Sequence, residues 1–449
     1  MDICYGFDSP PYVMSAVDRI IAIGDVHGDF QYLIELLKIA RVIAEENNED
    51  AQTFEYIWIG GKTHIVQLGD QIDNCRPTNF LCNEKGNIKN DRAQDAKIID
   101  FLYDLNKKAV EKGGRVISLL GNHELLNIQG EMSYVSYENI KEFGNVQGRI
   151  NAFKNTGEYG KKLICTRPAA VIIGSNLFVH AGILPEVIDI IPKLKDILNI
   201  GKETTSDSSK IDMTEFVRKS LKGEINKQEL YSFAPDNSDY IKFWDTIFKG
   251  RTRLYSENNV KTIIKAINKI QEIKNILQNN ITKISVSLQS GGAQLHDIEI
   301  LNLFIKKWLL GGIDKKYAEE MQKIDSLFWT RILGSLQKNE ISDTNKTCNS
   351  TVTPVLRTLN VRNMIVAHTP QFDMNQIGIN ATCVDKQSYG DQACLHKDST
   401  YSLWRVDIGG AEAFDKFDAE YLKTSNKGQN RRPQVLEILN DKCFKILKE

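Results

Sequence analysis

The chain has 449 residues, and its 57 Lys and Arg side chains nearly balance 58 Asp and Glu side chains, giving a formal net charge of −1. This length allows two or three domains, or one large domain with insertions. The balanced charge provides no overall attraction for nucleic acid or an anionic membrane, and no apolar stretch approaches the roughly 20 residues that a membrane-spanning helix needs.

Two features bear on the cellular compartment. The segment Met1–Met14 has neither the basic start nor the apolar centre of a secretory signal. The eight cysteines are scattered and form no CxxC pair, a pattern more typical of reduced thiols than of a disulfide framework. We therefore expect a cytoplasmic protein.

Strand-like and helix-like patterns alternate in the first part of the chain. A buried strand is predicted over 20–24, and apolar side chains at helical spacing from Phe30 to Ala44 predict a helix that runs to about Glu46. A second strand follows over 65–68. Apolar residues from 98 to 109 predict a second helix, which the Gly113-Gly114 pair ends.

Further strands are predicted later in the chain. One covers 116–120, and a hairpin pairs 171–173 with 177–179 around a Gly-Ser-Asn turn. The strand pattern resumes over 364–367 and 403–408. This alternation predicts a layered α/β fold, and such folds bind ligands at the carboxyl ends of their strands.

The middle of the chain has a different character. Helical stripes such as the isoleucines between 263 and 273 predict a largely helical insertion over 186–326. We expect this insertion to interrupt one catalytic domain over 15–440, with short terminal extensions at 1–14 and 441–449. A partner protein could bind at the insertion.

Five short polar motifs each follow a strand-like apolar run. They are Asp25–Asp29, Gly69–Asp73, Gly121–Glu124, Val179–Gly182 and Ala367–Gln371. In this order they resemble the five-block signature of calcineurin-like metallophosphoesterases, enzymes that hydrolyse phosphate esters with two metal ions. The resemblance implies a layered β-sandwich core flanked by helices.

Two metal ions held ~3.5–4 Å apart can activate a water, clamp a phosphate and stabilise an in-line displacement. Such a site needs a bridging carboxylate and a mixed shell of oxygen and nitrogen ligands, which suits Mn²⁺ best, with Fe or Zn as alternatives. We expect Asp25 and His27 to hold the first ion and Asp70 to bridge. The second ion then takes the remaining motif ligands, Asn122, His180 and His368.

The histidine that follows Asn122 has a different predicted role. His123 is expected to act as the general acid that protonates the leaving alkoxide, with Asp73 orienting its imidazole and favouring the charged form. The other three histidines lie outside the motifs and are more typical of surface or core positions, namely His64, His296 and His396.

Longer stretches around these motifs resemble one branch of the PPP protein phosphatases, the Shewanella-like (bacterial-like) phosphatases. The stretches are Leu119–Asn127 with Tyr134-Val135 beyond it, Phe178–Ile183, His368–Gln371 and Leu403–Gly409. The resemblance implies hydrolysis of phosphoprotein monoesters. It also implies that Arg331, in Phe328–Arg331, binds the substrate phosphate, with Asn122 beside it.

One departure from that family concerns phosphate recognition. The family usually has Arg-Gly after the second aspartate of the GDxxD block, whereas this chain has Asn74 and Cys75, with Arg76 next. We expect Cys75 to be a buried, inert thiol. We predict that Arg331 makes the main phosphate contact and that Arg76 partly substitutes, with Arg149 or Arg167 as alternatives.

Three functions remain open at this point. The leading one is a metal-dependent protein phosphatase, directed at Ser/Thr or Tyr. The second is a small-molecule phosphoesterase such as a dinucleoside-polyphosphate hydrolase, although Glu124 disfavours it because those enzymes tend to have Asp there. The third is a non-catalytic binding protein on the same fold, which the intact ligand set disfavours.

Overall fold

The computed structural model describes residues 4, 6–48, 53–77, 80–200, 295–338, 340, 344–372, 378–384, 392–394, 401–415 and 431–448. The chain divides into two compact units. One comprises Met1–Tyr5 and Lys195–Leu295, and the other comprises Gly6–Leu194 and His296–Glu449. The predicted site residues all belong to the second unit.

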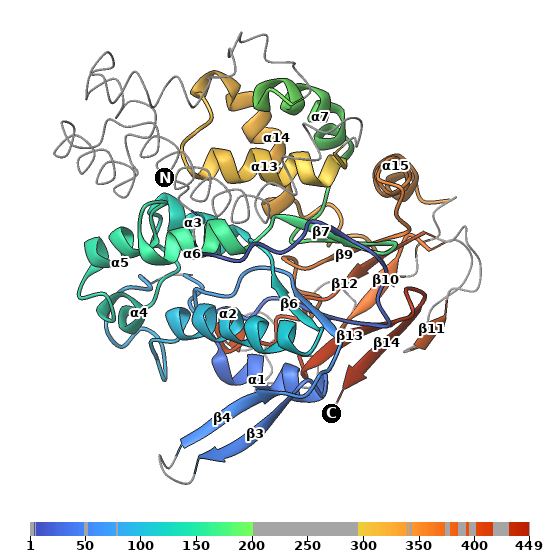
Figure 1. Cartoon of the computed structure of the whole chain (residues 1–449). Coiled ribbons are helices and arrows are strands. Elements are labelled where there is room, and N and C mark those ends of the chain that lie inside the picture. The colour runs from blue at the N-terminus through green and yellow to red at the C-terminus, as the bar shows by residue number, and fades with distance from the viewer. Residues whose placement is uncertain are drawn as a thin grey trace, which may run out of the picture. The chain divides into compact units, whose positions relative to one another are not determined.

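The second unit contains two six-stranded sheets (Figure 1). The first has the order β11-β14-β13-β2-β5-β6. Its parallel strands β2, β5 and β6 are Arg19–Ile23, His64–Gln67 and Arg115–Ser118. Its antiparallel strands β13, β14 and β11 are Gln434–Leu439, Cys443–Lys448 and Gln392–Cys394.

The second sheet has the order β1-β7-β8-β9-β12-β10. The predicted hairpin forms its β7 and β8, Ala170–Ile173 and Asn176–Val179, which pair antiparallel. Strand β9, Asn363–Val366, lies parallel to both β8 and β12, Ser402–Arg405. The outer strands β1 and β10 are Val13–Met14 and Asn380–Thr382.

Alternating side chains give the first sheet two buried faces. In β2, Ile20 and Ala22 pack in a core cluster with residues of the second sheet such as Phe178 and Trp404. Ile21 and Ile23 point to the opposite face and join a second cluster with residues of the flanking helices. The arrangement confirms the predicted layered β-sandwich core flanked by helices.

Two of these helices cover the outer face of the first sheet. Helix α1, Phe30–Ile39, is capped by Asp29, whose carboxylate accepts from the Tyr32 backbone N–H. Helix α2, Asp95–Glu111, ends just before the predicted glycine pair. Both helices place buried leucines and isoleucines in the outer cluster, so burial of these stripes fixes the helices on the sheet.

Four helices follow β6 and lead to the second sheet. They are α3 (Asn122–Gln129), α4 (Tyr137–Lys141), α5 (Val146–Phe153) and α6 (Glu158–Thr166). Helix α15 (Thr353–Thr358) is preceded by a π-helical turn at Cys348–Val352, and a 3₁₀ turn at Glu412–Phe414 follows β12 in the chain.

The first helix is shorter than predicted. Helix α1 ends at Ile39, because Arg41 adopts a left-handed backbone conformation with a φ of 55°. Ala44 then lies in β3, Ile43–Asn48, which pairs with β4, Thr53–Trp58. Figure 1 shows this hairpin projecting from the helices and sheets around it.

The C-terminus also differs from the expected short extension at 441–449. Cys443–Lys448 forms β14, which pairs along its whole length with β13. Strand β13 itself lies directly beside β2. The apolar run Val435 to Leu439 carries the signal for this pairing, because Val435, Leu436 and Ile438 are fully buried.

The described ends of the predicted insertion are helical. They contain α7 (Pro185–Leu198), α13 (Asp297–Leu309) and α14 (Ala318–Trp329), with a 3₁₀ turn at Lys315–Tyr317. The isoleucine stripe between 263 and 273 lies outside the described residues. Within the described ranges, no helix combines the length and apolar character needed to cross a bilayer.

The cysteines contradict the expectation of reduced thiols. Disulfides join Cys75 to Cys82 and Cys348 to Cys383, and three further cysteines are also disulfide-bonded, namely Cys4, Cys165 and Cys443. Spacing along the sequence failed as a guide because the fold brings together cysteines 35 residues apart. The argument for a cytoplasmic location therefore loses its basis in the thiols.

Candidate active site

Most of the predicted site residues lie in the turns that follow the strands, whereas Asn122 and His123 begin α3 and Arg331 follows α14. Several of these turns require unusual backbone conformations. His27, Asp70, Asp73 and His368 all have positive φ values, of 46°, 50°, 70° and 64°. Left-handed conformations of non-glycine residues cost of order 1–3 kcal/mol each and gather at functional sites. Packing around these turns holds the four side chains in place despite that cost.

Two glycines allow the turns after β5 and β6 to approach closely. A Cβ at Gly121 would lie 2.2 Å from Asp70 Oδ1, and a Cβ at Gly69 would lie 2.7 Å from the Gly121 backbone. Gly69 also has a φ of 96°, which favours glycine. The close approach lets the His123 backbone N–H donate to Asp70 Oδ1 at 3.0 Å.

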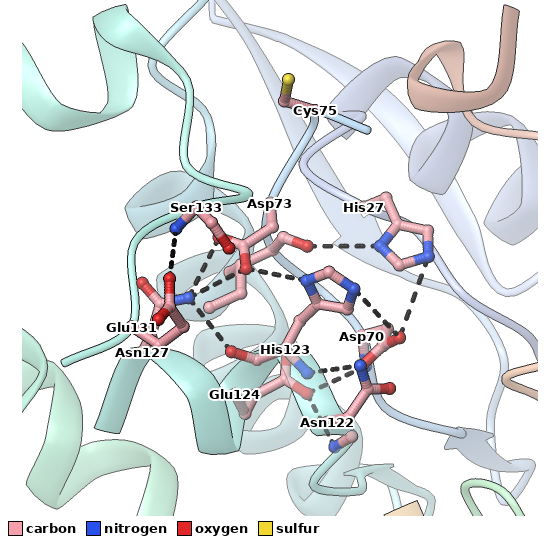
Figure 2. A network of polar contacts seen from close by, with 12 residues as sticks. His27, Asp70, Asp73, Cys75, Asn122, His123, Glu124, Asn127, Glu131 and Ser133 are labelled. Atoms are coloured by element: carbon pink, nitrogen blue, oxygen red, sulfur yellow. Dashed lines mark hydrogen bonds and ion pairs between the residues drawn. The ribbon is translucent and has the colours of Figure 1, made fainter. Parts of the chain in front are cut away.

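The structure brings nitrogen and oxygen donors together in two overlapping groups. One contains His27, Asp70 and His123, and the other contains Asp70, His180 and His368, with the donor atoms of each group within 4.8 Å of one another. Asp70 is common to both. Its Oδ2 lies 3.8 Å from His27 Nε2 and 3.9 Å from His123 Nε2 (Figure 2). The same oxygen lies 3.4 Å from His180 Nε2.

Asp25 and Asn122 complete this set. Asp25 Oδ2 lies 3.7 Å from His27 Nε2, and Asp25 Oδ1 lies 3.8 Å from His180 Nδ1. Asn122 Oδ1 lies 2.9 Å from His180 Nε2. All six predicted metal ligands therefore converge, and all six are buried.

Backbone carbonyls orient two of the imidazoles. His180 Nδ1 lies 2.7 Å from Leu68 O, and His27 Nδ1 lies 3.4 Å from Ile72 O. Donation from Nδ1 to a carbonyl places the lone pair on Nε2, as in histidines that bind metals. In both residues Nε2 is the atom that faces Asp70.

The donor set fits divalent cations. Asp25 Oδ2 and His368 Nε2 are buried and have no hydrogen-bond partner, which is costly unless another ligand satisfies them. Burial, together with the nearby Asp407 and Asp70, raises the pKa of Asp25 well above its usual value. Burial also lowers the pKa of His368 to about 2, which keeps the imidazole neutral as metal binding requires.

Asp407 is a further buried carboxylate at this site that the motifs did not identify. Its Oδ2 has no hydrogen-bond partner, and its Oδ1 accepts from the Gly409 N–H at 2.8 Å. Burial raises its pKa to about 6. Asp407 follows β12 in the same way that Asp25 follows β2. This position after a strand could have identified Asp407 as a site residue from the sequence.

The predicted acid and its orienting carboxylate are in contact. His123 Nδ1 lies 2.8 Å from Asp73 Oδ2, while its Nε2 faces Asp70. Figure 2 shows the His123 ring between these two carboxylates. Asn127 Nδ2 donates to both carboxylate oxygens of Asp73 at 3.0 Å each. This arrangement fixes both nitrogens of the ring and points Nε2 toward the donor groups.

Glu124 has a structural role that the motif alone did not reveal. Its carboxylate accepts backbone N–H groups from Asp70 at 2.9 Å, Gln71 at 2.8 Å and Gly121 at 2.7 Å. It therefore joins the turns after β5 and β6. Burial, followed by the charge of Asp70, raises its pKa to about 7.

Asn74 and Arg76 point in different directions. The Asn74 side chain is hydrogen-bonded to Asp91 and Asn139, away from the imidazoles. Arg76 instead places Nη2 2.5 Å from His27 Nε2, and its guanidinium lies 4.8 Å from the centre of the Phe414 ring. Cys75, between them, is buried and disulfide-bonded, and it points away from the cluster (Figure 2).

The other candidate arginines fall into two groups. Arg331 is exposed, and its Nη1 donates to His368 O at 3.3 Å. Arg149 and Arg167 are buried and bound to protein groups: Arg149 to Asp95 and Arg167 to Gln71. Arg331 and Arg76 therefore lie at the site, whereas Arg149 and Arg167 are bound to other protein groups.

Known proteins similar to this chain include phosphatases. A family model described as calcineurin-like phosphoesterase matches residues 18–270. An uncharacterized protein of Acanthamoeba polyphaga mimivirus is 27% identical over 364 residues, covering 77% of this chain and 97% of the viral protein. Shewanella-like protein phosphatase 2 of Arabidopsis thaliana is 26% identical over 214 residues, 38% of this chain and 48% of the plant protein.

A third relative is Shewanella-like protein phosphatase 1 of Plasmodium berghei (strain Anka), 35% identical over 168 residues, which are 37% of this chain and 39% of that protein. The alignments thus span less than half of either Shewanella-like relative. A solved cold-active protein-tyrosine phosphatase of a psychrophilic Shewanella species aligns with a TM-score of 0.42 and 16% identity, covering 100% of this chain and 85% of that one. Since the family model matches more than half of the 449 residues, the chain belongs to the calcineurin-like phosphoesterase family and is a phosphoric ester hydrolase.

Proposed function

We propose that this protein is a dinuclear-metal phosphatase that hydrolyses phosphomonoesters of proteins. The observation that carries the proposal is the position of Asp70, which belongs to both donor groups and so is suited to bridge two ions. The similarity to proteins named Shewanella-like protein phosphatases supports a phosphoprotein substrate. Glu124 disfavours a dinucleoside-polyphosphate substrate, because hydrolases of that class tend to have Asp at this position. The near-zero net charge provides no overall attraction for nucleic acid or membranes.

Six side chains would hold the ions in this proposal. Asp25 and His27 would bind one ion, and Asn122, His180 and His368 would bind the other. Asp70 would bind both. Two bound divalent ions, preferably Mn²⁺, would supply a nucleophilic hydroxide and charge neutralisation. The mixed nitrogen and oxygen donors also suit Fe or Zn.

The chain's own residues would then handle the proton and the phosphate. His123 would donate a proton from Nε2 to the leaving oxygen, while Asp73 holds Nδ1 and stabilises the imidazolium. Asn122 and Arg331 would contact the phosphate oxygens. Arg76 would join them after leaving His27 Nε2, because a guanidinium and a metal ion cannot both occupy that position.

The phosphate contacts can be tested with two substitutions. Arg331→Ala is expected to raise KM and lower kcat together, for a loss of roughly ten- to a hundredfold in kcat/KM, because charge-assisted hydrogen bonds are worth about 1.5–3 kcal/mol. Arg76→Ala should have a smaller effect. Arg357→Ala is the matched control, since Arg357 is an exposed arginine of α15 that packs on Tyr401.

The result that would contradict this assignment is an Arg331→Ala enzyme with the kinetics of the Arg357→Ala enzyme. The structure also indicates what to expect of Asn74→Arg. Such a change would break the hydrogen bonds of Asn74 to Asp91 and Asn139. It is therefore not expected to restore the family's usual arginine contact.

The substrate class can be tested directly. We expect purified protein to bind about two divalent ions per chain and to hydrolyse phosphopeptides and p-nitrophenyl phosphate in Mn²⁺. Phosphoserine, phosphothreonine and phosphotyrosine peptides of the same sequence would reveal the preferred residue. Diadenosine polyphosphate serves as the competing substrate, and faster turnover of it would replace the phosphoprotein proposal with the small-molecule one. Full activity in excess EDTA would reject the metal requirement.

A further inference from the structure

A fully buried arginine lies behind the pair formed by His123 and Asp73. Arg149, on α5, donates to Asn127 Oδ1 from two nitrogens, Nε at 3.0 Å and Nη2 at 2.8 Å. The same Nη2 donates to Asp95 Oδ2 at 2.7 Å and lies 3.5 Å from Asp73 Oδ1. One guanidinium thus contacts groups from α2, α3 and the turn after β5.

The contact between Arg149 and Asn127 determines which way the Asn127 amide faces. A guanidinium has donors and no acceptor, so the Asn127 atom that faces it must be the carbonyl oxygen. The amide nitrogen is then directed at Asp73, where it donates to both carboxylate oxygens. A reversed amide would place its oxygen against the Asp73 carboxylate and its N–H groups against Arg149.

Asp95 anchors the other side of Arg149 and closes the ring of contacts. Its Oδ1 accepts the Asp73 backbone N–H at 3.2 Å, and its backbone N–H donates to Asn139 Oδ1 at 3.1 Å. Burial raises the pKa of Asp95 to about 6, while the charge of Arg149 acts in the opposite direction. The Arg149 guanidinium also lies 4.3 Å from the centre of the Phe153 ring, which restricts its movement.

We propose that Arg149 is a positioning residue for the phosphatase reaction, acting through Asn127 to hold Asp73 against His123. This inference rests on the proposed function of His123 as general acid. Arg149 does not face the proposed metal-donor groups. Its contribution is therefore to the orientation of the His123 ring. A displacement of about 1 Å in such a group can cost on the order of 10²-fold in rate.

Two variants test the role while preserving most of the volume. Arg149→Lys keeps the charge but loses the fork that binds the amide, and Asn127→Asp keeps an acceptor for Arg149 but removes the donor to Asp73. We expect each to lower kcat about tenfold or more on a phosphoserine peptide, with little change in KM and full metal content. The loss on p-nitrophenyl phosphate should be smaller, since its leaving group needs little protonation. Arg19→Lys is the control, because Arg19 lies at the end of β2 opposite Asp25 and is paired with Glu437.

The decisive measurement combines these variants with His123→Ala. If Arg149 acts through His123, Arg149→Lys should cost almost nothing further in the His123→Ala enzyme. If the loss in kcat of the double variant equalled the product of the two single-variant losses, the positioning role would be overturned. A loss for Arg149→Lys that is equal on the phosphoserine peptide and on p-nitrophenyl phosphate would overturn it as well. An Arg149→Lys enzyme with wild-type kinetics would do the same. If His123→Ala alone had no effect on the phosphoserine peptide, the general-acid proposal itself would fail. If Arg149→Lys does not fold, Asn127→Asp carries the same comparison.

Discussion

Asp70→Asn is expected to remove both metal retention and turnover. The substitution keeps an oxygen that can accept the His123 backbone N–H, as Oδ1 does at 3.0 Å. It replaces Oδ2, however, with an N–H group directed at the Nε2 atoms of His27, His123 and His180. An amide nitrogen cannot bridge two cations. Loss of an outer-shell partner typically costs about 10–100-fold in metal affinity or activity, and loss of a shared ligand should cost more.

The substitution also has an electrostatic consequence. Although burial alone disfavours the charged carboxylate, the imidazoles of His180 and His123 hold the pKa of Asp70 well below its usual value. Asp70 is thus expected to be ionised at any pH at which the enzyme works. Its replacement removes a negative charge that both donor groups share.

Metal content and turnover should be measured on the same preparation of the variant. Asp441→Asn is the matched control, because Asp441 accepts the Ser175 N–H at 2.9 Å next to β8, at the end opposite His180. The control should retain both ions and activity. A folded Asp70→Asn protein that keeps two ions and wild-type turnover would reject the bridging role.

The sequence predicted the fold class, and the positions of the motif residues at strand ends have a physical explanation. Asp25 and Asp70 follow neighbouring parallel strands of one sheet, and His180 and His368 follow neighbouring parallel strands of the other. Because the carboxyl ends of neighbouring parallel strands meet at one edge, motif order was enough to predict that the side chains within each pair lie close together. The apolar runs of β2, β5 and β8 were clear because successive side chains of these strands are buried.

Features that depend on tertiary contact were missed. The strand β3 has the polar sequence IAEENN and is defined by pairing with β4 rather than by apolar alternation. Asp407 follows a predicted strand but lies in no motif with a known ligand. Asn74 and Arg76 could be recognised from the sequence as a departure from the family. The different directions of their side chains could not, because they depend on contacts with residues distant in the sequence, Asn139 for Asn74 and His27 for Arg76.

His123→Ala is expected to lower turnover by ~10²–10⁴-fold on a phosphoserine peptide, whose alkoxide leaving group needs a proton. The loss on p-nitrophenyl phosphate should be much smaller, because nitrophenolate leaves without one. Metal content should persist, since Asn122 rather than His123 is the proposed ligand. Asp73→Asn should show the same dependence on the leaving group with a smaller loss, because the amide can still accept from His123 Nδ1 but carries no charge to stabilise the imidazolium.

A histidine outside the site gives the comparison for this experiment. His64→Ala removes an imidazole at the start of β5 whose Nδ1 lies 3.1 Å from Lys62 O, and it should leave both activities unchanged. His123 is also a member of one donor group, 3.9 Å from Asp70, so its role as a ligand is the alternative to be tested. A ligand role predicts loss of bound metal and equal losses on the two substrates. A general-acid role predicts full metal content and a loss that grows with the pKa of the leaving group.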